Sequence, residues 1–321
     1  MRRLLGLVAV ALLCAIGAGL LSAAALASNA YQPIAVQHIT GTRLGPSMTM
    51  AITPVPSPPD QASAAAKVTQ AVHEVLPNAQ VGFTVFDRQN NTVLISHDAD
   101  RQFASMSLVK LLIALDELAS DNWTVPEEAT RQELHQMLAD SNDGIASNWW
   151  AANGGPAIVI RMVGLLGLTG TEPPENSGRW GNTLTTPQDV VTVYRYITDQ
   201  VPSPSRDVLL SALADAQRIA EDGFDQYFGI PVAMPGTPWA IKQGWGTSGS
   251  QAVMLSTGLV GPGLRYVVVV LASAPTRSYS TIPAAITAGT DALAEVIDPA
   301  IYRLGVNGSV PNASETVPSP P

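Results

Sequence analysis

The chain has 321 residues, of which 46% are hydrophobic and 13% charged, a composition that supports a sizeable packed core and excludes a wholly disordered protein. Its formal charge of −9 argues against nucleic acid as a partner, because a polyanion attracts basic proteins. With a single cysteine and four histidines that lack ligand spacing, we expect no metal and no cofactor.

The N-terminus has the layout of a secretion signal. Arg2 and Arg3 precede a long apolar run within residues 4–27, which ends in the small-residue sequence Ala-Leu-Ala. The run is longer than a usual signal core, so residues 1–27 are either a cleaved signal peptide or a retained membrane anchor. We interpret Cys14 as part of this run, since the preceding leucine is too bulky for a lipoprotein cleavage signal. Both alternatives predict an exported domain, outside the cell or in the cell envelope.

The rest of the chain predicts one folded domain between two unstructured segments. Residues 28–61 are rich in proline and lack periodicity, which favours an extended linker. Residues 304–321 combine Gly, Asn, Ser, Thr and Pro with few apolar groups, which predicts a disordered tail. Residues 62–303 are therefore expected to form the folded domain.

Within this domain the predicted elements follow a definite order. A helix over residues 62–76 precedes two alternating strands, 81–87 and 92–97, joined by a polar hairpin turn. Helices are predicted next over residues 108–118, 127–138, 145–152, 157–166, 188–197 and 207–221. Strands follow from residue 239, over 252–259 and over 266–272, and a helix over 283–297 closes the domain. The order predicts an α/β (α+β) fold, in which an antiparallel sheet with flanking helices is built from the N- and C-terminal segments. An all-α lobe is inserted between its second and third strands.

Two of the chain's three lysines lie in short motifs that favour a nucleophilic site. Ser107 and Lys110 stand three residues apart at the start of an apolar helix, which puts both side chains on one face. An amine with a lowered pKa can take the hydroxyl proton and make the serine a nucleophile. Lys242 is followed by Gln243 and Gly244 at the start of a strand, where glycine allows another backbone to approach closely.

This order of elements and motifs resembles the penicillin-recognising serine hydrolases, in particular the class A β-lactamases. The resemblance covers residues 62–303. Each motif alone is weakly specific, but the occurrence of five motifs in the family's order is specific. The matching segments are Phe103 to Lys110, Ser141-Asn142-Asp143, Gly154-Gly155-Pro156, Thr185-Thr186-Pro187 and Lys242-Gln243-Gly244.

The resemblance implies a mechanism. Ser107 attacks a carbonyl carbon and forms an acyl-enzyme, while Lys110 takes the hydroxyl proton. Burial and the charge of Lys242 would lower the pKa of Lys110, and Lys242 would attract a substrate carboxylate. Ser141 would relay the proton to the leaving nitrogen. The backbone N–H groups of Ser107 and Trp245 would form the oxyanion hole.

The motifs also depart from the family pattern at positions that would bind substrate. Asn142 and Asp143 invert the usual Asp-Asn order, so a carboxylate replaces the amide that holds the substrate side chain, unless a one-residue slip puts Asn142 there. Gln243 stands where the family usually has Thr or Ser against the β-lactam carboxylate, before Gly244 and Trp245. Family members activate the deacylating water with a loop glutamate, for which Glu172 is the first candidate and Glu175 the second.

The sequence therefore predicts an exported, monomeric serine hydrolase that forms an acyl-enzyme on Ser107 with amide or ester substrates, including β-lactams. The substrate would be a small molecule or a cell-wall peptide. Two alternatives stay open. The chain could be a binding or scaffold protein that keeps the fold without turnover, or a D-Ala-D-Ala carboxypeptidase of the penicillin-binding type.

Overall fold

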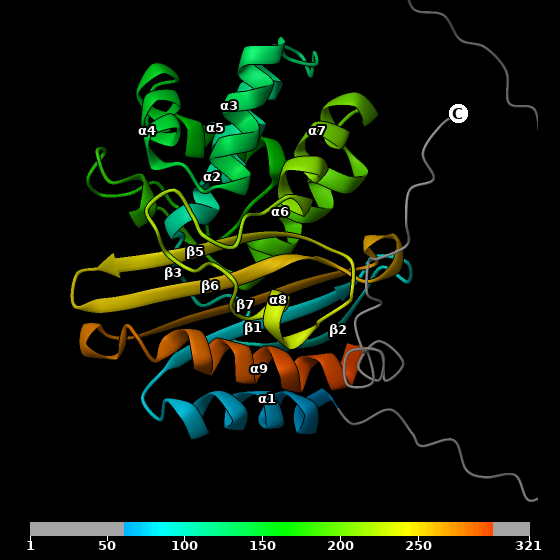
Figure 1. Cartoon of the computed structure of the whole chain (residues 1–321), viewed down its shortest axis with the longest axis vertical. Helices are drawn as coiled ribbons and strands as arrows, with labels where there is room; N and C mark the ends of the chain where they lie inside the picture. The colour runs from blue at the N-terminus through cyan, green and yellow to red at the C-terminus, as the bar shows by residue number, and fades with distance from the viewer. Residues whose placement is uncertain (1–60, 298–321) are drawn as a thin grey trace, which may run out of the picture. The chain divides into compact units, whose positions relative to one another are not determined.

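The computed structural model describes residues 61–297 (Figure 1). The predicted signal or anchor, the tail over 304–321 and all but one residue of the linker over 28–61 lie outside the described residues. Residues 298–303, the end of the predicted domain, lie outside them as well.

A five-stranded antiparallel sheet, in the order β2-β1-β7-β6-β5, forms the middle layer of this part of the chain (Figure 1). The strands are β1 (Gln80–Asp87), β2 (Thr92–His97), β5 (Trp239–Ser248), β6 (Gln251–Val260) and β7 (Tyr266–Pro275). The early strand β1 pairs directly with the late strand β7, with Val85 opposite Val268. The predicted fold class, a sheet assembled from both ends of the domain, is confirmed.

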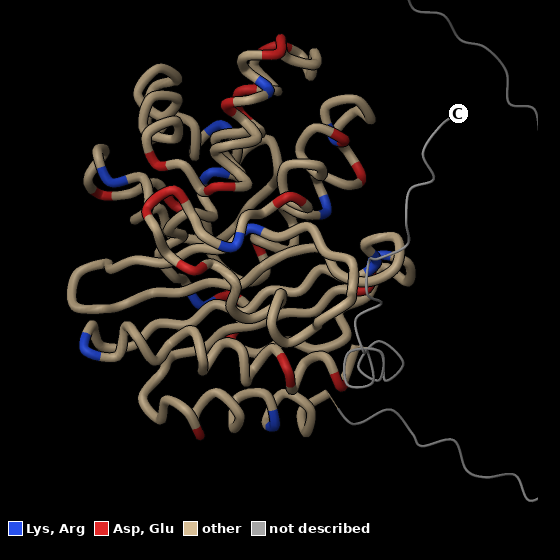
Figure 2. Tube along the Cα trace, viewed as in Figure 1, with Lys and Arg blue, Asp and Glu red and all other residues tan. Residues whose placement is uncertain are grey.

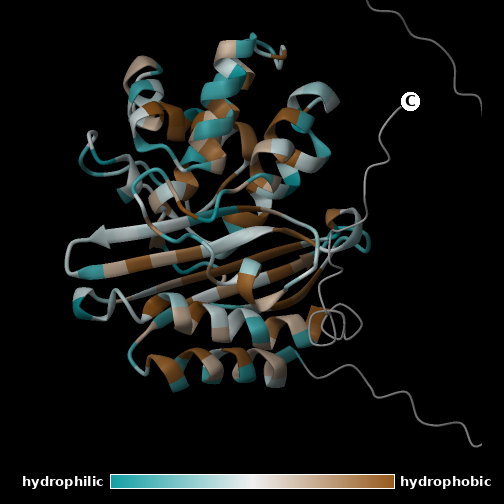
Figure 3. Cartoon of the chain, in the orientation of Figure 1, coloured by the Kyte–Doolittle hydropathy of each residue, from teal (hydrophilic) through white to brown (hydrophobic). Residues whose placement is uncertain are grey.

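Both faces of the sheet are covered, and β7 shows why its sequence is an unbroken apolar run. Val267 and Val269 belong to the core under the helical lobe, whereas Val268 and Val270 belong to the core on the opposite face. Successive strand residues point to opposite faces, so a strand covered on both sides needs apolar residues at every position. The helices α1 (Gln61–Val75) and α9 (Ile282–Ile297) lie side by side over that second face, with their apolar sides toward the sheet (Figures 1 and 3).

The helical lobe covers the other face. Its helices are α2 (Val109–Ser120), α3 (Glu128–Ala139), α4 (Asp143–Ala152), α5 (Pro156–Leu166), α6 (Pro187–Asp199) and α7 (Ser203–Ala214). A short sheet of β3 (Phe103–Ala104) and β4 (Leu184–Thr185) belongs to the same insertion. The insertion also contains the short helix α8 (Ile230–Ala233), which packs against α9 on the opposite face of the sheet. Charged residues are concentrated in the lobe and its loops, while the strands carry few (Figure 2). No helix within residues 61–297 has the length and apolar character needed to cross a membrane.

One predicted helix is wrong at both ends. The helix expected over residues 207–221 begins at Ser203 and ends at Ala214. The chain leaves the helix because other acceptors take its backbone donors: the N–H of Gln217 donates to the carbonyl of Ala139, and that of Glu221 to Asp140. Tertiary hydrogen bonds to the end of α3 thus override the local helical pattern.

Candidate active site

Ser107 lies in a 3-10 turn, η1 (Met106–Leu108), immediately before α2. Its neighbour Met106 has a φ of 46°, a left-handed conformation that residues with a side chain rarely adopt. Such strain persists only where the surrounding structure fixes it, and it is concentrated at functional sites. α2 itself is buried on nearly all sides, so it holds Lys110, one turn beyond Ser107, inside the protein.

The amine of Lys110 is fully buried and surrounded by oxygen acceptors. Its Nζ lies 2.9 Å from Ser107 Oγ, 3.1 Å from Ser141 Oγ and 2.7 Å from the Ser141 carbonyl oxygen. Asp143 Oδ1 lies 2.5 Å away, and the Trp180 ring stands over the amine at 4.9 Å. Four acceptors surround Nζ, whereas an ammonium group has three protons to donate. If Ser107 Oγ stops accepting from Nζ, the other three acceptors can still pair with all of its protons.

Lys242 approaches the same point from the sheet. Its side chain, 1% exposed, extends from β5 and donates to Ser141 Oγ at 2.9 Å and to its neighbour's carbonyl, that of Gln243, at 3.2 Å. The Ser141 hydroxyl thus lies between two amines, those of Lys110 and Lys242. Three segments that are far apart in the sequence therefore form one hydrogen-bonded group, which consists of Ser107 with Lys110, Ser141 and Lys242.

Burial dominates the electrostatics of the two amines. Loss of hydration lowers the pKa of Lys110, and the carboxylate of Asp143 partly opposes that shift. The pKa of Lys242 is well below its ordinary value, because the amine is buried and the charge of Lys110 stands nearby. A pair of this kind favours one positive charge over two, which leaves an amine able to accept a proton.

The contacts of Asn142 and Asp143 show which of the two side chains faces Lys110. Asn142 is the N-cap of α4, and its Oδ1 accepts a hydrogen bond from the backbone N–H of Ile145 at 2.9 Å. Asp143, the next residue, turns its carboxylate to Lys110 instead. A carboxylate, and not the amide of a slipped Asn142, therefore faces the amine.

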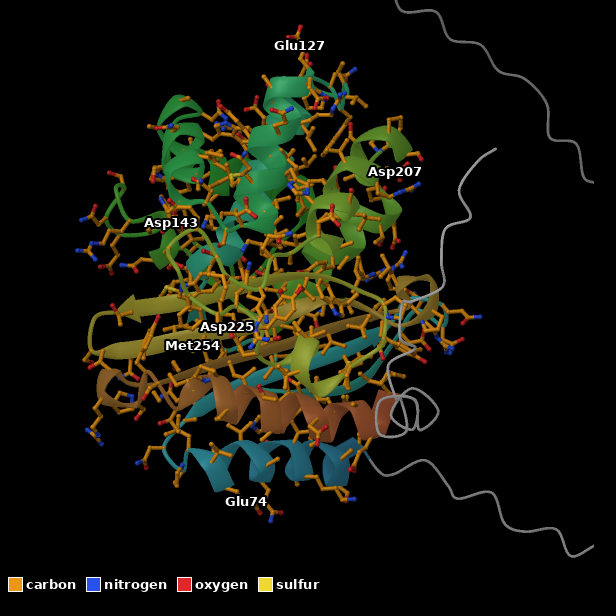
Figure 4. All side chains as sticks on the ribbon, in the orientation of Figure 1. Glu74, Glu127, Asp143, Asp207, Asp225 and Met254 are labelled. Atoms are coloured by element: carbon orange, nitrogen blue, oxygen red, sulfur yellow. The ribbon has the colours of Figure 1, made fainter. Side chains whose placement is uncertain are left out.

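Ser107 opens onto a cavity of about 450 Å³ between the helical lobe and the end of β5. Figure 4 shows Asp143 where the lower end of α4 approaches the sheet. The cavity wall includes Ser107, Asp143, Arg179, Trp180, Asp222, Trp245 and Tyr279.

β5 approaches the turn of Ser107 closely because it carries Gly244. A Cβ at this position would lie 3.1 Å from the carbonyl oxygen of Ser105 and 3.2 Å from the Cβ of Met106. Gly244 does not itself line the cavity; it lets the strand and the turn meet. Trp245, the next residue, does line it, and its Nε1 donates to Asp222 Oδ2 at 2.9 Å.

Gln243, expected to contact substrate, points away from the cavity. Its side chain is buried; its Nε2 donates to the carbonyl oxygens of Phe228 and Gln226, and its Oε1 accepts from the N–H of Thr257. The sequence-based assignment of Gln243 to substrate binding is therefore corrected to a structural role. The alternation of side chains along β5 places it on the face opposite Lys242.

Glu172 does not lie beside Ser107 and the two lysines. Its exposed side chain accepts from Gln102 at 2.8 Å, and its backbone bridges to Leu184, outside the cavity wall. Glu175 is exposed and likewise outside the wall. The part of this loop that reaches the turn of Ser107 is the short helix η2 (Trp180–Asn182), which brings an indole, and not either glutamate, to Lys110.

Relatives of the chain were found among mycobacterial proteins. Proteins of Mycobacterium tuberculosis and Mycobacterium bovis, each described as "Putative lipoprotein LppW", are 35% identical over 212 residues, which cover 64% of this chain and 67% of theirs. The chain belongs to the LppW family. No family model matches the sequence.

Solved structures support the fold of this LppW relative. A β-lactamase from Chitinophaga pinensis superposes with a TM-score of 0.59 at 16% identity, covering 74% of this chain and all of that one. The TLA-3 extended-spectrum β-lactamase gives 0.59 at 14% identity over 73% of this chain and 98% of its own. A class A β-lactamase from Mycobacterium abscessus gives 0.56 at 19%, over 72% and 98%. The scaffold is that of the class A β-lactamases.

Sequence reasoning did not find Asp222, and it did not assign Trp180 or Tyr279 to the cavity. Trp180 follows an exposed loop, and no spacing rule connects it to Lys110. Asp222 directly follows the segment that was predicted to be helical over residues 207–221, so its position beside Trp245 depends on tertiary hydrogen bonds. Within residues 61–297, no three His, Cys, Asp or Glu side chains gather in an arrangement that could hold a metal ion.

Proposed function

We propose that this protein is a serine hydrolase of the cell envelope that forms a long-lived acyl-enzyme on Ser107. The observation that carries the proposal is the 2.9 Å contact between Ser107 Oγ and the buried amine of Lys110, at the edge of an open cavity. A buried lysine with a lowered pKa can serve as a general base, and its serine partner can serve as a nucleophile.

The chemistry follows from these contacts. Neutral Lys110 takes the proton of Ser107 as Oγ attacks the carbonyl carbon of an amide or ester. When the carbonyl re-forms, the bond to the leaving nitrogen or oxygen breaks, and Ser141 passes a proton from Lys110 or Lys242 to that atom. The backbone N–H groups of Ser107 and Trp245, assigned by the family resemblance, would stabilise the oxyanion.

Slow release of the acyl group is the second part of the proposal. Hydrolysis needs a base that activates water beside the acyl carbon. Of the carboxylates in the cavity wall, Asp143 is paired with Lys110, and Asp222 accepts from Trp245 Nε1 and the N–H of Phe224. Glu172 stands outside the wall. We therefore expect acylation to outpace deacylation.

The envelope location rests on two observations. The N-terminal apolar run has the layout of an export signal, and the LppW relatives are described as lipoproteins. We expect the protein in the membrane fraction or the extracellular fraction, depending on whether residues 1–27 are retained. Fractionation of cells that express the full chain and Cys14→Ser distinguishes attachment through that cysteine from attachment through the apolar run.

Labelling with a fluorescent penicillin tests the proposed function. We expect a covalent label that survives denaturation in the wild type and disappears in Ser107→Ala. Ser105→Ala is the matched control: Ser105 is two residues away, is buried, and its Oγ has no hydrogen-bond partner within the described part of the chain. Labelling of Ser107→Ala at the wild-type level would overturn the proposal. So would a folded wild type that no penicillin or activated ester labels, which would instead favour a non-catalytic scaffold.

A further inference from the structure

Asp143 gives the cavity a chemical character that the proposed reaction does not require. Its Oδ1 accepts from Lys110, but its Oδ2 has no hydrogen-bond donor among residues 61–297, and the side chain is 56% exposed in the cavity wall. A carboxylate only accepts hydrogen bonds. It repels the oxygen of a substrate amide, whereas it attracts a donor, above all a charged one.

Most of the other charged or aromatic side chains of the wall also favour a cation, and Arg179 is the exception. A second carboxylate, Asp222, lines the cavity. Trp180 and Trp245 also line it, and indole faces attract cations. One face of each indole is already used: Lys110 stands over Trp180 at 4.9 Å, and Phe224 stacks on Trp245 at 4.8 Å. Arg179, which is exposed, is the basic residue of the wall within the described part of the chain.

The two lysines of the site do not offset these charges at the surface. Lys110 is fully buried and paired with Asp143. Lys242 is 1% exposed, and both of its donor contacts go to protein oxygens. A ligand in the cavity would meet Asp143 and the indoles before it could reach either amine.

We propose that the acyl group transferred to Ser107 carries a free ammonium group, which binds between Asp143 and the aromatic wall. The substrate class is an amino-bearing amide or ester, such as a peptide with a free amino group near the scissile bond. Acylamido substrates without that charge are disfavoured, because Asp143 cannot donate to their carbonyl oxygen. This inference rests on the proposed acylation of Ser107.

Three penicillins that differ in one substituent test the proposed preference for an acyl group with a free ammonium group. Benzylpenicillin, ampicillin and carbenicillin share a phenylacetyl side chain, to which ampicillin adds an amine and carbenicillin a carboxylate. At a pH where that amine is protonated, we expect ampicillin to acylate Ser107 about fivefold faster than benzylpenicillin, and carbenicillin about fivefold more slowly, the size of one exposed charge contact. High salt should reduce both ratios.

Asp143→Asn separates this preference from the chemistry. The substitution also changes the surroundings of Lys110, but that effect is common to the three penicillins and cancels in their ratios. We expect the preference for ampicillin to disappear in Asp143→Asn and to weaken in Asp222→Asn, with thermal unfolding used to check that both variants fold.

The possible results are distinguishable. Equal rates for the three penicillins in the wild type would overturn the inference while leaving the acylation of Ser107 intact. A preference that survives unchanged in folded Asp143→Asn would overturn it too. If none of the three acylates Ser107 in the folded wild type, the proposed function fails, and this inference fails with it.

Discussion

The floor and the rim of the cavity differ in how they are built. The floor consists of Ser107, Lys110, Ser141 and Lys242, which are buried and joined to one another by hydrogen bonds. The rim, made of Asp143, Trp180, Asp222 and Tyr279, comes from loops and from the first turn of a helix, and its side chains are more exposed. The floor residues are those of the motifs that resemble the β-lactamases, and Asp143 on the rim departs from the family pattern.

In the proposed function, acylation and substrate choice depend on separate parts of this molecule. The floor is held from both sides of the site, by the apolar helix α2 and by the central sheet, so its geometry follows from the fold. Asp143 and Asp222 on the rim are exposed and can change without loss of the scaffold, whereas Trp180 and Tyr279 also pack against the core. Substitutions in the floor should therefore abolish chemistry, whereas substitutions in the rim should redirect it.

The largest effect is expected from Lys110→Met, which removes the amine and keeps much of the side-chain volume. Without its general base, Ser107 should be acylated about 10²- to 10⁴-fold more slowly, as measured by the rate of fluorescent penicillin labelling. Lys67→Met is the control, since Lys67 is an exposed residue of α1. Labelling of Lys110→Met at the control rate would show that Lys110 is not the general base for Ser107.

A smaller effect is expected where β5 meets the turn of Ser107. Gly244→Ala would bring a methyl group 3.1 Å from the Ser105 carbonyl oxygen, which requires a shift of a few tenths of an ångström. We expect acylation to fall about tenfold, with the thermal midpoint little changed. In Gly178→Ala the new methyl group meets only ordinary contact distances, so its acylation rate should stay near the wild type. Equal rates in the two variants would contradict the close-approach argument.

A change of pH dependence is expected from Asp143→Asn. The carboxylate opposes the effect of burial and holds the pKa of Lys110 up, so its removal lowers that pKa. Lys110 acts as a base only when neutral, hence the rising limb of the acylation rate should move to lower pH in the variant. Rates measured with benzylpenicillin across the neutral range test this. A shift to higher pH would mean that another group limits the reaction.

The smallest effect on acylation is expected from a charge outside both regions. Asp87 is 1% exposed and receives two hydrogen bonds from Arg265, which lowers its pKa. Asp87→Asn should cost about 1–3 kcal/mol of unfolding free energy at neutral pH and leave the acylation rate unchanged.

The lowered pKa of Asp87 also determines how its contribution to stability changes with pH. The stabilisation from Asp87 is complete above its unfolded pKa of 3.8 and is lost as pH falls through the lower folded value. Urea unfolding of the wild type should therefore show an acid-dependent loss of stability that is smaller in Asp87→Asn. An identical loss in both proteins would rule out this ion pair as its source.

The sequence was informative where residues obey local periodicity or a short motif. The alternation in β1 and β2 could be read directly from the sequence. The same holds for the helical spacing of Ser107 and Lys110, because η1 and α2 follow each other without a break. The approach of Lys242 could be inferred only through the family resemblance, since β5 is more than a hundred residues away. The positions of Glu172, Gln243 and Asp222 depend on hydrogen bonds between distant loops, which no local pattern encodes.

Intact-mass spectrometry of the protein during and after incubation with benzylpenicillin tests the central claim most directly. We expect a species heavier by one penicillin molecule that persists after the free drug is removed and is absent in Ser107→Ala. A wild type that folds but keeps its unmodified mass throughout, or whose adduct disappears as fast as it forms, would contradict it.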